Sequence, residues 1–241
     1  MSKQMKQFIL SKNLRSSLII LFFISCSNLI DENDLVEKES IKYLKNSDVP
    51  FSGEVVGQFD NGQNQIEGQY NEGKRFGVWI EYYNNGNKKE KGKYKDGLKV
   101  EEWLTYFKDG IIKSKGVYIS GLKDGLWKYW YNSGKKEKEL QFLENRENGK
   151  ALTWYENEKE KSVSTYLVGV LNGEFLEWDQ NGNIISKGIF KTGKKWSGHF
   201  GDDHYINGIG GSLFVKYFKN GQKKVEGILI NGKKTGPWSE W

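Results

Sequence analysis

The chain repeats a unit of 24 residues, and this repetition constrains its fold more than any other feature. Residues 77–100 (GVWIEYYNNGNKKEKGKYKDGLKV) and 101–124 (EEWLTYFKDGIIKSKGVYISGLKD) are adjacent copies. Further copies begin at Gly53, Gly125, Gly149, Gly173 and Ser212, and a truncated copy begins at Gly236. We number positions within a unit as columns one to 24. Repetition at this period indicates an array of one small structural unit.

Four columns of the unit hold most of the aromatic residues. Column three contains Trp79, Trp103, Trp127, Phe175, Phe214 and Trp238; column six contains Tyr82, Tyr106, Trp130, Trp154, Trp178, Tyr217 and Trp241; column seven contains Phe59, Tyr83, Phe107, Tyr131, Tyr155 and Phe218; column eighteen contains Tyr70, Tyr94, Tyr118, Phe142, Tyr166 and Phe190. Because the period is even, each column of a strand keeps its face. We therefore expect columns three, seven and eighteen on one face, and column six on the other beneath lysines such as Lys89, Lys113 and Lys224.

Glycine-containing turns divide each unit into two strands. Asn85-Gly86 and Asp109-Gly110 separate runs rich in aromatic and β-branched residues, which predicts a hairpin with a tight primed turn. Asp96-Gly97 then turns the chain into the next unit. The predicted fold is all-β, an extended single-layer antiparallel β-meander of 24-residue hairpins. In this register Trp79 lies opposite Gly92, where its ring would cover the glycine backbone.

The unit resembles the bacterial variant of the MORN repeat. The resemblance rests on Gly125, Trp127, Trp130, Tyr131, Gly134 and Lys135, and on Gly188, Phe190, Gly193 and Lys194, and it extends over residues 53–241. It implies the antiparallel ribbon and supplies no catalytic residues. Many proteins of this kind are described as antitoxins of toxin–antitoxin pairs (the YwqK family), and more distant MORN proteins bind membranes or partners. Ala151, Glu158 and Asp179 depart from the pattern.

Residues 1–25 resemble the signal peptide of a bacterial lipoprotein. Basic residues precede an apolar run over 18–24, which is too short to span a bilayer as a helix. Ile-Ser-Cys at its end resembles a lipobox, which implies cleavage before Cys26, the only cysteine, and acylation of its thiol. The alternative is an ordinary signal peptide with an incidental cysteine. We thus expect a lipid-anchored membrane protein of the cell envelope, in the inner or outer membrane or at the cell surface.

The remaining chain divides into four segments. We predict an acylated cysteine and acidic tether over 26–52, six tandem repeats over 53–196, an irregular Gly-rich insertion over 197–211, and one further repeat with a truncated one over 212–241. Gln58 replaces the sixth-column aromatic in the first unit, as in an atypical terminal copy.

The positive charge of the chain belongs largely to the predicted signal peptide. The sequence has 37 Lys and Arg against 31 acids, a net +6. Removing Lys3, Lys6, Lys12 and Arg15 leaves 33 bases against 31 acids, a net +2. This near-neutral balance argues against nucleic acid as a partner.

Few residues are suited to catalysis or metal binding. The two histidines, His199 and His204, flank Asp202 and Asp203 in the Gly-rich segment, which makes these four residues weak candidates for a metal site. A hydrolase acting on glycans through paired carboxylates is a less favoured alternative, because a one-layer ribbon offers no deep cleft. We predict no enzymatic activity, no cofactor and no small-molecule substrate.

Binding is the expected function, and the aromatic face is the expected surface. The candidate residues are Trp79, Tyr83, Trp103, Phe107, Trp127, Tyr131 and Tyr155. An unidentified protein partner is the first hypothesis, because exposed apolar patches and unpaired strand edges are places where partners add. A membrane-lipid or glycan-binding module is the alternative.

Overall fold

The computed structural model describes residues 29–201, 203–206 and 208–241. The predicted signal peptide and Cys26 lie outside these residues. The described elements are β1 (Ile30–Asp31), a 3-10 helix η1 (Glu32–Asp34), β2 (Leu35–Lys38), β3 (Ile41–Leu44), β4 (Gly53–Gln58), β5 (Asn64–Asn71), β6 (Lys74–Tyr82), β7 (Lys88–Lys95), β8 (Leu98–Tyr106), β9 (Ile112–Ile119), β10 (Leu122–Trp130), β11 (Lys136–Leu143), β12 (Arg146–Trp154), β13 (Glu160–Leu167), β14 (Val170–Trp178), β15 (Ile184–Lys191), β16 (Lys194–Phe200), β17 (Asp203–Ile206), β18 (Ile209–Tyr217), β19 (Lys223–Ile230) and β20 (Lys233–Glu240).

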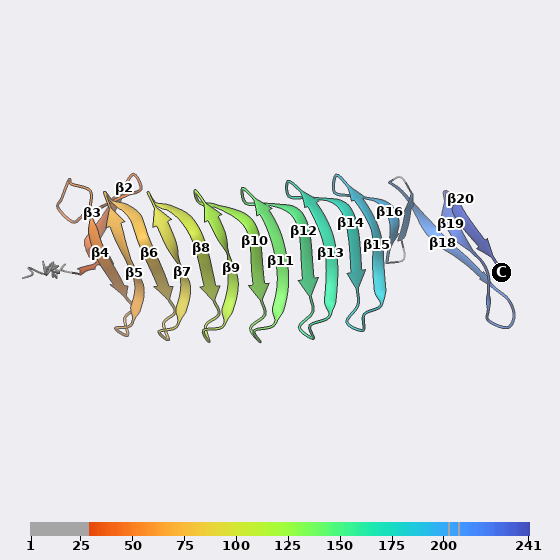
Figure 1. Cartoon of the computed structure of the whole chain (residues 1–241), viewed down its shortest axis with the longest axis horizontal. Helices are drawn as coiled ribbons and strands as arrows, with labels where there is room; N and C mark the ends of the chain where they lie inside the picture. Colours follow the sequence, from red (N-terminus) through yellow and green to blue (C-terminus); the bar gives the residue numbers. More distant parts are fainter. Residues whose placement is uncertain (1–28, 202, 207) are drawn as a thin grey trace, which may run out of the picture.

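The strands form one long ribbon, which confirms the predicted meander (Figure 1). From β4 to β20 each strand pairs antiparallel with the next in the chain, and β1 adds parallel to β4, giving a sheet of 18 strands. The strands from β4 to β15 stack evenly, and β18 to β20 are tilted relative to them (Figure 1). In the part of the chain that the structure describes, no helix is long and apolar enough to cross a bilayer.

The predicted register is confirmed within the units, but the primed turn predicted at the hairpin tip is not found there. Trp79 pairs with Gly92, and Trp103 pairs with Gly116. The primed turn lies between units, where Asp96 and Gly97 have φ values of 52° and 80°. At the hairpin tip only Gly86 has positive φ, and its N–H donates to the Tyr83 carbonyl. That tip is a longer loop with a bulge before Tyr82.

Each column-three Trp covers a glycine of the preceding hairpin, which corrects the prediction that it covers its paired glycine. A bulge separates the Lys91–Leu104 and Lys93–Val100 pairs, and Glu101 within it has φ 59°. The bulge displaces Trp103 over Gly92, where a Cβ atom would lie 2.2 Å from its indole carbons. Trp103 is consequently only 3% exposed.

The covered rings form a continuous stack, here called the ring ladder, along one face. It consists of Phe51, Tyr70, Trp79, Tyr94, Trp103, Tyr118, Trp127 and Phe142, with consecutive centroids 5.0 to 6.3 Å apart. All consecutive pairs meet edge to face, an arrangement that aromatic rings favour. Columns three and eighteen therefore share a face, as predicted. We call it the ladder face and the other side the opposite face.

Where column three lacks a Trp, the residue beneath it changes in size. Ala151 in column three lies opposite Leu140, which replaces the glycine of the preceding unit, and the two are buried, at 3% and 9% exposure. Phe175 follows Ser164, which is 6% exposed and is its cross-strand partner. Large and small residues thus alternate between adjacent units to keep the contact filled.

Residues 29–52 form a folded cap, which corrects the prediction of a tether. The cap contains the β2–β3 hairpin, whose turn residues Glu39 and Ser40 both have positive φ. Leu35 and Phe51 are buried against Val55, Tyr70 and Trp79. The first unit has Val55 in column three, and Phe51 supplies the ring that this unit lacks. Burial of the first unit by an atypical element is usual in repeat arrays.

The described residues between 197 and 211 continue the sheet, whereas the sequence predicted an irregular insertion. The described part contains the end of β16, the short strand β17 and the start of β18. Phe200 is 6% exposed and lies over Gly188, so it takes the place of a column-three ring. The glycines that suggested a loop allow this close packing: a Cβ atom on Gly198 would lie 2.3 Å from the Gly188 backbone.

Candidate binding surfaces

The column-three tryptophans are core residues and do not offer their faces to a partner. Trp79, Trp103 and Trp127 are 2 to 3% exposed, and the Trp79 and Trp127 indoles donate to the Gln69 and Val117 carbonyls at 3.1 Å. Direct contact of a partner with these rings, as the sequence suggested, would require the ladder to open.

A cation four residues before each column-three Trp covers its ring. The Arg75 guanidinium carbon lies 4.2 Å from the Trp79 centroid. The ammonium groups of Lys99, Lys123 and Lys234 lie 3.9, 4.2 and 4.3 Å from Trp103, Trp127 and Trp238. These cations occupy column 23. Ala151 and Phe175, in contrast, follow Glu147 and Leu171, so the cation accompanies the Trp.

Of the three lysines predicted to lie over column six, Lys113 and Lys224 lie over column seven instead, and Lys89 pairs with Glu81 at 3.4 Å. The Lys113 and Lys224 ammonium groups are 5.6 and 5.4 Å from the Phe107 and Phe218 centroids. The bulge before the hairpin tip shifts these lysines along the strand relative to the prediction. Sequence spacing alone carried no sign of that bulge.

The column-seven candidates lie at the hairpin tips and are partly buried: Tyr83, Phe107, Tyr131 and Tyr155. The tyrosine hydroxyls connect successive units: Tyr83 donates to the Tyr106 carbonyl at 2.8 Å, and Tyr131 and Tyr155 make equivalent bonds to Trp154 and Trp178. Asp179 instead accepts hydrogen bonds from the backbone of its own turn. The rings are partly exposed, but the tyrosine hydroxyls are already hydrogen-bonded to backbone carbonyls of the next unit.

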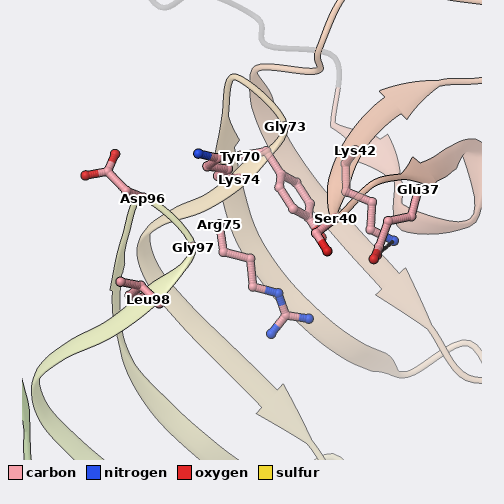
Figure 2. Close-up of a pocket in the computed structure, with 10 residues that line it drawn as sticks. All are labelled: Glu37, Ser40, Lys42, Tyr70, Gly73, Lys74, Arg75, Asp96, Gly97 and Leu98. Carbon is pink, nitrogen blue, oxygen red and sulfur yellow. Dashed lines mark ion pairs between the residues drawn. The ribbon is translucent and has the colours of Figure 1, made fainter. Parts of the chain in front are cut away.

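A pocket of about 360 Å³ lies between the cap and the first two units (Figure 2). Tyr70 projects into it between the cap and Arg75, and Lys42 pairs with Glu37 at 3.6 Å on the cap side (Figure 2). Burial, followed by the nearby Glu32 carboxylate, raises the pKa of Tyr70, and its hydroxyl donates to Glu32 at 2.9 Å. Lys42, Glu37 and Arg75 have ion-pair partners within the chain, and the pocket lies at the junction between the cap and the repeats.

The opposite face exposes a group of aliphatic side chains. We define the opposite-face patch as six of them, which are 39 to 57% exposed: Leu98, Val117, Ile119, Leu122, Leu126 and Leu143. Each adjoins a ladder-face residue in sequence and therefore points to the other side. Ile119 pairs directly with Leu122, and Leu98 packs near the turn at Gly121. Sequence reasoning missed this patch because its columns are apolar in only some units.

The charged residues beside the patch pair with one another. Lys115 lies 2.6 Å from Glu102, and Lys93 lies 2.8 Å from Glu101. Lys128 and Glu139 are direct cross-strand partners on the same face. The patch is thus apolar at its centre and nearly neutral at its border, the composition of a protein-contact surface.

The histidines are brought together, although only part of the predicted metal site can be described. His199 and His204 are direct cross-strand partners in β16 and β17. Asp203 pairs with Lys195 at 3.1 Å. Asp202 and the His204 side chain lie outside the described structure. Among the described residues, no three His, Cys, Asp or Glu side chains are grouped closely enough to hold a metal.

Comparison with protein families agrees with the hairpin unit. A family model for the MORN repeat variant matches residues 77–96, 123–144 and 171–192. The repeats are MORN-like. Each match covers one hairpin, β6–β7, β10–β11 or β14–β15. A search of curated proteins found no match to the chain. MORN-like repeats indicate a repeat-based binding scaffold.

Proposed function

We propose that the chain is a non-enzymatic, protein-binding scaffold of the cell envelope, anchored by a lipid on Cys26. Its partner contacts the opposite-face patch. The exposure of the patch carries this proposal, because the same units that bury their Trp rings leave six aliphatic side chains in solvent. The toxin binding implied by the family resemblance would be one form of this activity.

A flat protein surface fits the patch better than a small ligand. The patch spans β8 to β11 along the turns between units, and apolar surface of this kind becomes favourable to bury when another flat surface covers it. The rings of column three are not available, and the hydroxyls of column seven are engaged within the fold. A lipid bilayer is the competing flat surface, and the experiment below separates the two.

Replacing Ile119 and Leu122 together by Ser is expected to abolish partner capture without unfolding the chain. Both side chains are exposed, at 57% and 39%, so the substitutions remove little buried surface. The matched control is Ile111→Ser with Ile112→Ser at a hairpin tip, where exposure is 36% and 37%. Capture from detergent-solubilised envelopes of the source cells is quantified by mass spectrometry, with folding checked by circular dichroism.

Loss of capture in the patch variant alone supports the proposal. Equal capture by both variants contradicts the assigned surface. Co-sedimentation with liposomes or envelope polysaccharide, lost in the patch variant in the absence of any protein partner, assigns the patch to lipid or glycan instead.

Cys26→Ala is expected to abolish incorporation of labelled fatty acid and to leave an uncleaved precursor. The reason is that the thiol is the predicted site of acylation. Metabolic labelling followed by gel electrophoresis measures both effects. Equal labelling of the variant and the parent would show that the anchor is elsewhere or absent.

A further inference from the structure

The cations of column 23 differ in one respect, namely whether the chain supplies an acid for them. Arg75 lies 4.0 Å from Glu81, Lys195 lies 3.1 Å from Asp203, and Lys234 lies 3.9 Å from Glu240. Lys99 forms a short ion pair with Glu90. Lys123 is the exception: within the described ranges, no carboxylate lies within ion-pair distance of it.

The residues around Lys123 explain this difference. Glu81 lies six residues after Arg75, and the residue six after Lys123 is Tyr129. Glu90 is the cross-strand partner of Glu81, and the cross-strand partner of Tyr129 is Lys138. The position of the Glu81–Glu90 pair is therefore occupied by Tyr129 and Lys138 two units later. Like Lys123, Lys138 has no carboxylate within ion-pair distance among the described residues.

Three hydrogen-bond donors converge at this place on the ladder face. The Lys123 ammonium donates to the Tyr129 hydroxyl at 3.1 Å, and the Lys138 ammonium lies 4.8 Å from the Tyr129 centroid. Burial raises the pKa of Tyr129 to about 12, so the hydroxyl keeps its proton at neutral pH and can donate it. Glu137 and Glu147 act on Tyr129 only through longer-range electrostatics.

The positive charge of Lys123 is not neutralised by any carboxylate of the described residues, and other lysines lie near it. Burial lowers the pKa of its ammonium, and the nearby Lys138 and Lys99 lower it further. Two neighbouring ammonium groups repel one another, and an anion between them removes that repulsion. All three side chains are only partly buried, so a group from solvent can reach them.

We propose that Lys123, Tyr129 and Lys138 form a binding site for an acidic side chain, Asp or Glu, of a partner protein. A carboxylate is the ligand class because each of the four equivalent cations meets a Glu or Asp of the chain itself. The site lies on the ladder face, so it is separate from the opposite-face patch. It goes beyond the proposed function by giving the scaffold a second contact surface.

The test is titration of the full chain in detergent with a hexaglutamate peptide at constant ionic strength. Binding is followed by NMR shifts of the lysine side chains and of the Tyr129 ring. Lys138→Gln removes one ammonium, and Tyr129→Glu supplies the acid that Arg75 already has. Each is expected to weaken binding about tenfold or more, because a charge-assisted contact is lost or occupied internally.

Lys128→Gln is the matched control, since it removes the same charge from the same strand as Tyr129 but on the opposite face. It is expected to leave binding unchanged. Equal weakening by Lys128→Gln and Lys138→Gln, or parental binding by Tyr129→Glu, overturns the proposal. Inorganic phosphate that binds better than the peptide at the same ionic strength also overturns it, by assigning a phosphoryl ligand. The Ile119→Ser, Leu122→Ser variant should bind the peptide like the parent, whatever becomes of the patch.

Discussion

Trp127→Ala is expected to lower the free energy of unfolding by about 3 to 5 kcal/mol. Trp127 is 2% exposed, and its ring packs against Tyr118 and Phe142 at 5.0 and 6.3 Å. The substitution leaves a cavity above Gly116, removes the indole hydrogen bond to Val117 and exposes the Lys123 stem. Chemical denaturation monitored by circular dichroism measures the loss.

The damage should stay near the substitution. Each unit contacts only its neighbours, so hydrogen exchange should accelerate most around residues 101–148 and least near the cap. Adding Gly116→Leu should restore part of the stability, because Leu140 beneath Ala151 is a native example of that pair. Uniform loss of protection along the ribbon, or no gain from Gly116→Leu, would contradict nearest-neighbour packing.

Gly92→Ala is expected to cost about 3 kcal/mol, although it adds only one methyl group. The new Cβ atom would lie 2.2 Å from two indole carbons of Trp103, which is far inside van der Waals contact. The ring must leave its place, and the contact between Lys99 and the ring is lost with it. Equilibrium unfolding in urea provides the measurement.

A double-mutant cycle supplies the control for Gly92→Ala. In a Trp103→Ala background the methyl group enters empty space, so Gly92→Ala should be neutral or stabilising there. The same destabilisation in both backgrounds would mean that the cost arises in the backbone and not from the ring.

The sequence predicted the strands and their pairing well because these depend on local signals. Asp96-Gly97 and the aromatic columns recur at a constant spacing, and an even period keeps each column on its face. The pairing of Trp79 with Gly92 followed directly. The covered glycine was predicted in the wrong unit, because the bulge at column one was not anticipated. Its left-handed residue is a glycine in most units, such as Gly77 and Gly125, and that recurring glycine was the available signal; Glu101 adopts the same conformation without that preference.

The candidate site was less predictable because it depends on side-chain contacts across units. Arg75 and Trp79 are four residues apart, a spacing with no special meaning in a flat strand, and only the bulge brings them together. The cap was not predicted because the acidic residues of this segment indicated a tether. Its apolar residues Leu35 and Phe51 become buried only by packing against the first unit. The co-occurrence of Gly, cation and Trp in columns 16, 23 and three was visible in the sequence and is the signal that could have revealed the stacking.

The placement of each ring over the preceding unit determines how such an array can be lengthened or recombined. A unit copied from column one to column 24 includes its column-three ring. It does not include the glycine that this ring covers, because that glycine lies in column 16 of the preceding unit. Inserting residues 149–172 after Lys99 and Val100, for example, would set Ala151 above Gly92 and leave a void. The segment from Gly116 to Trp127 keeps glycine, cation and ring together, as the segment from Leu140 to Ala151 keeps its own set. Exchange of these 12-residue segments would preserve packing. The segment that can be exchanged between units therefore does not have the same boundaries as the hairpin of the backbone, because it begins in one hairpin and ends in the next.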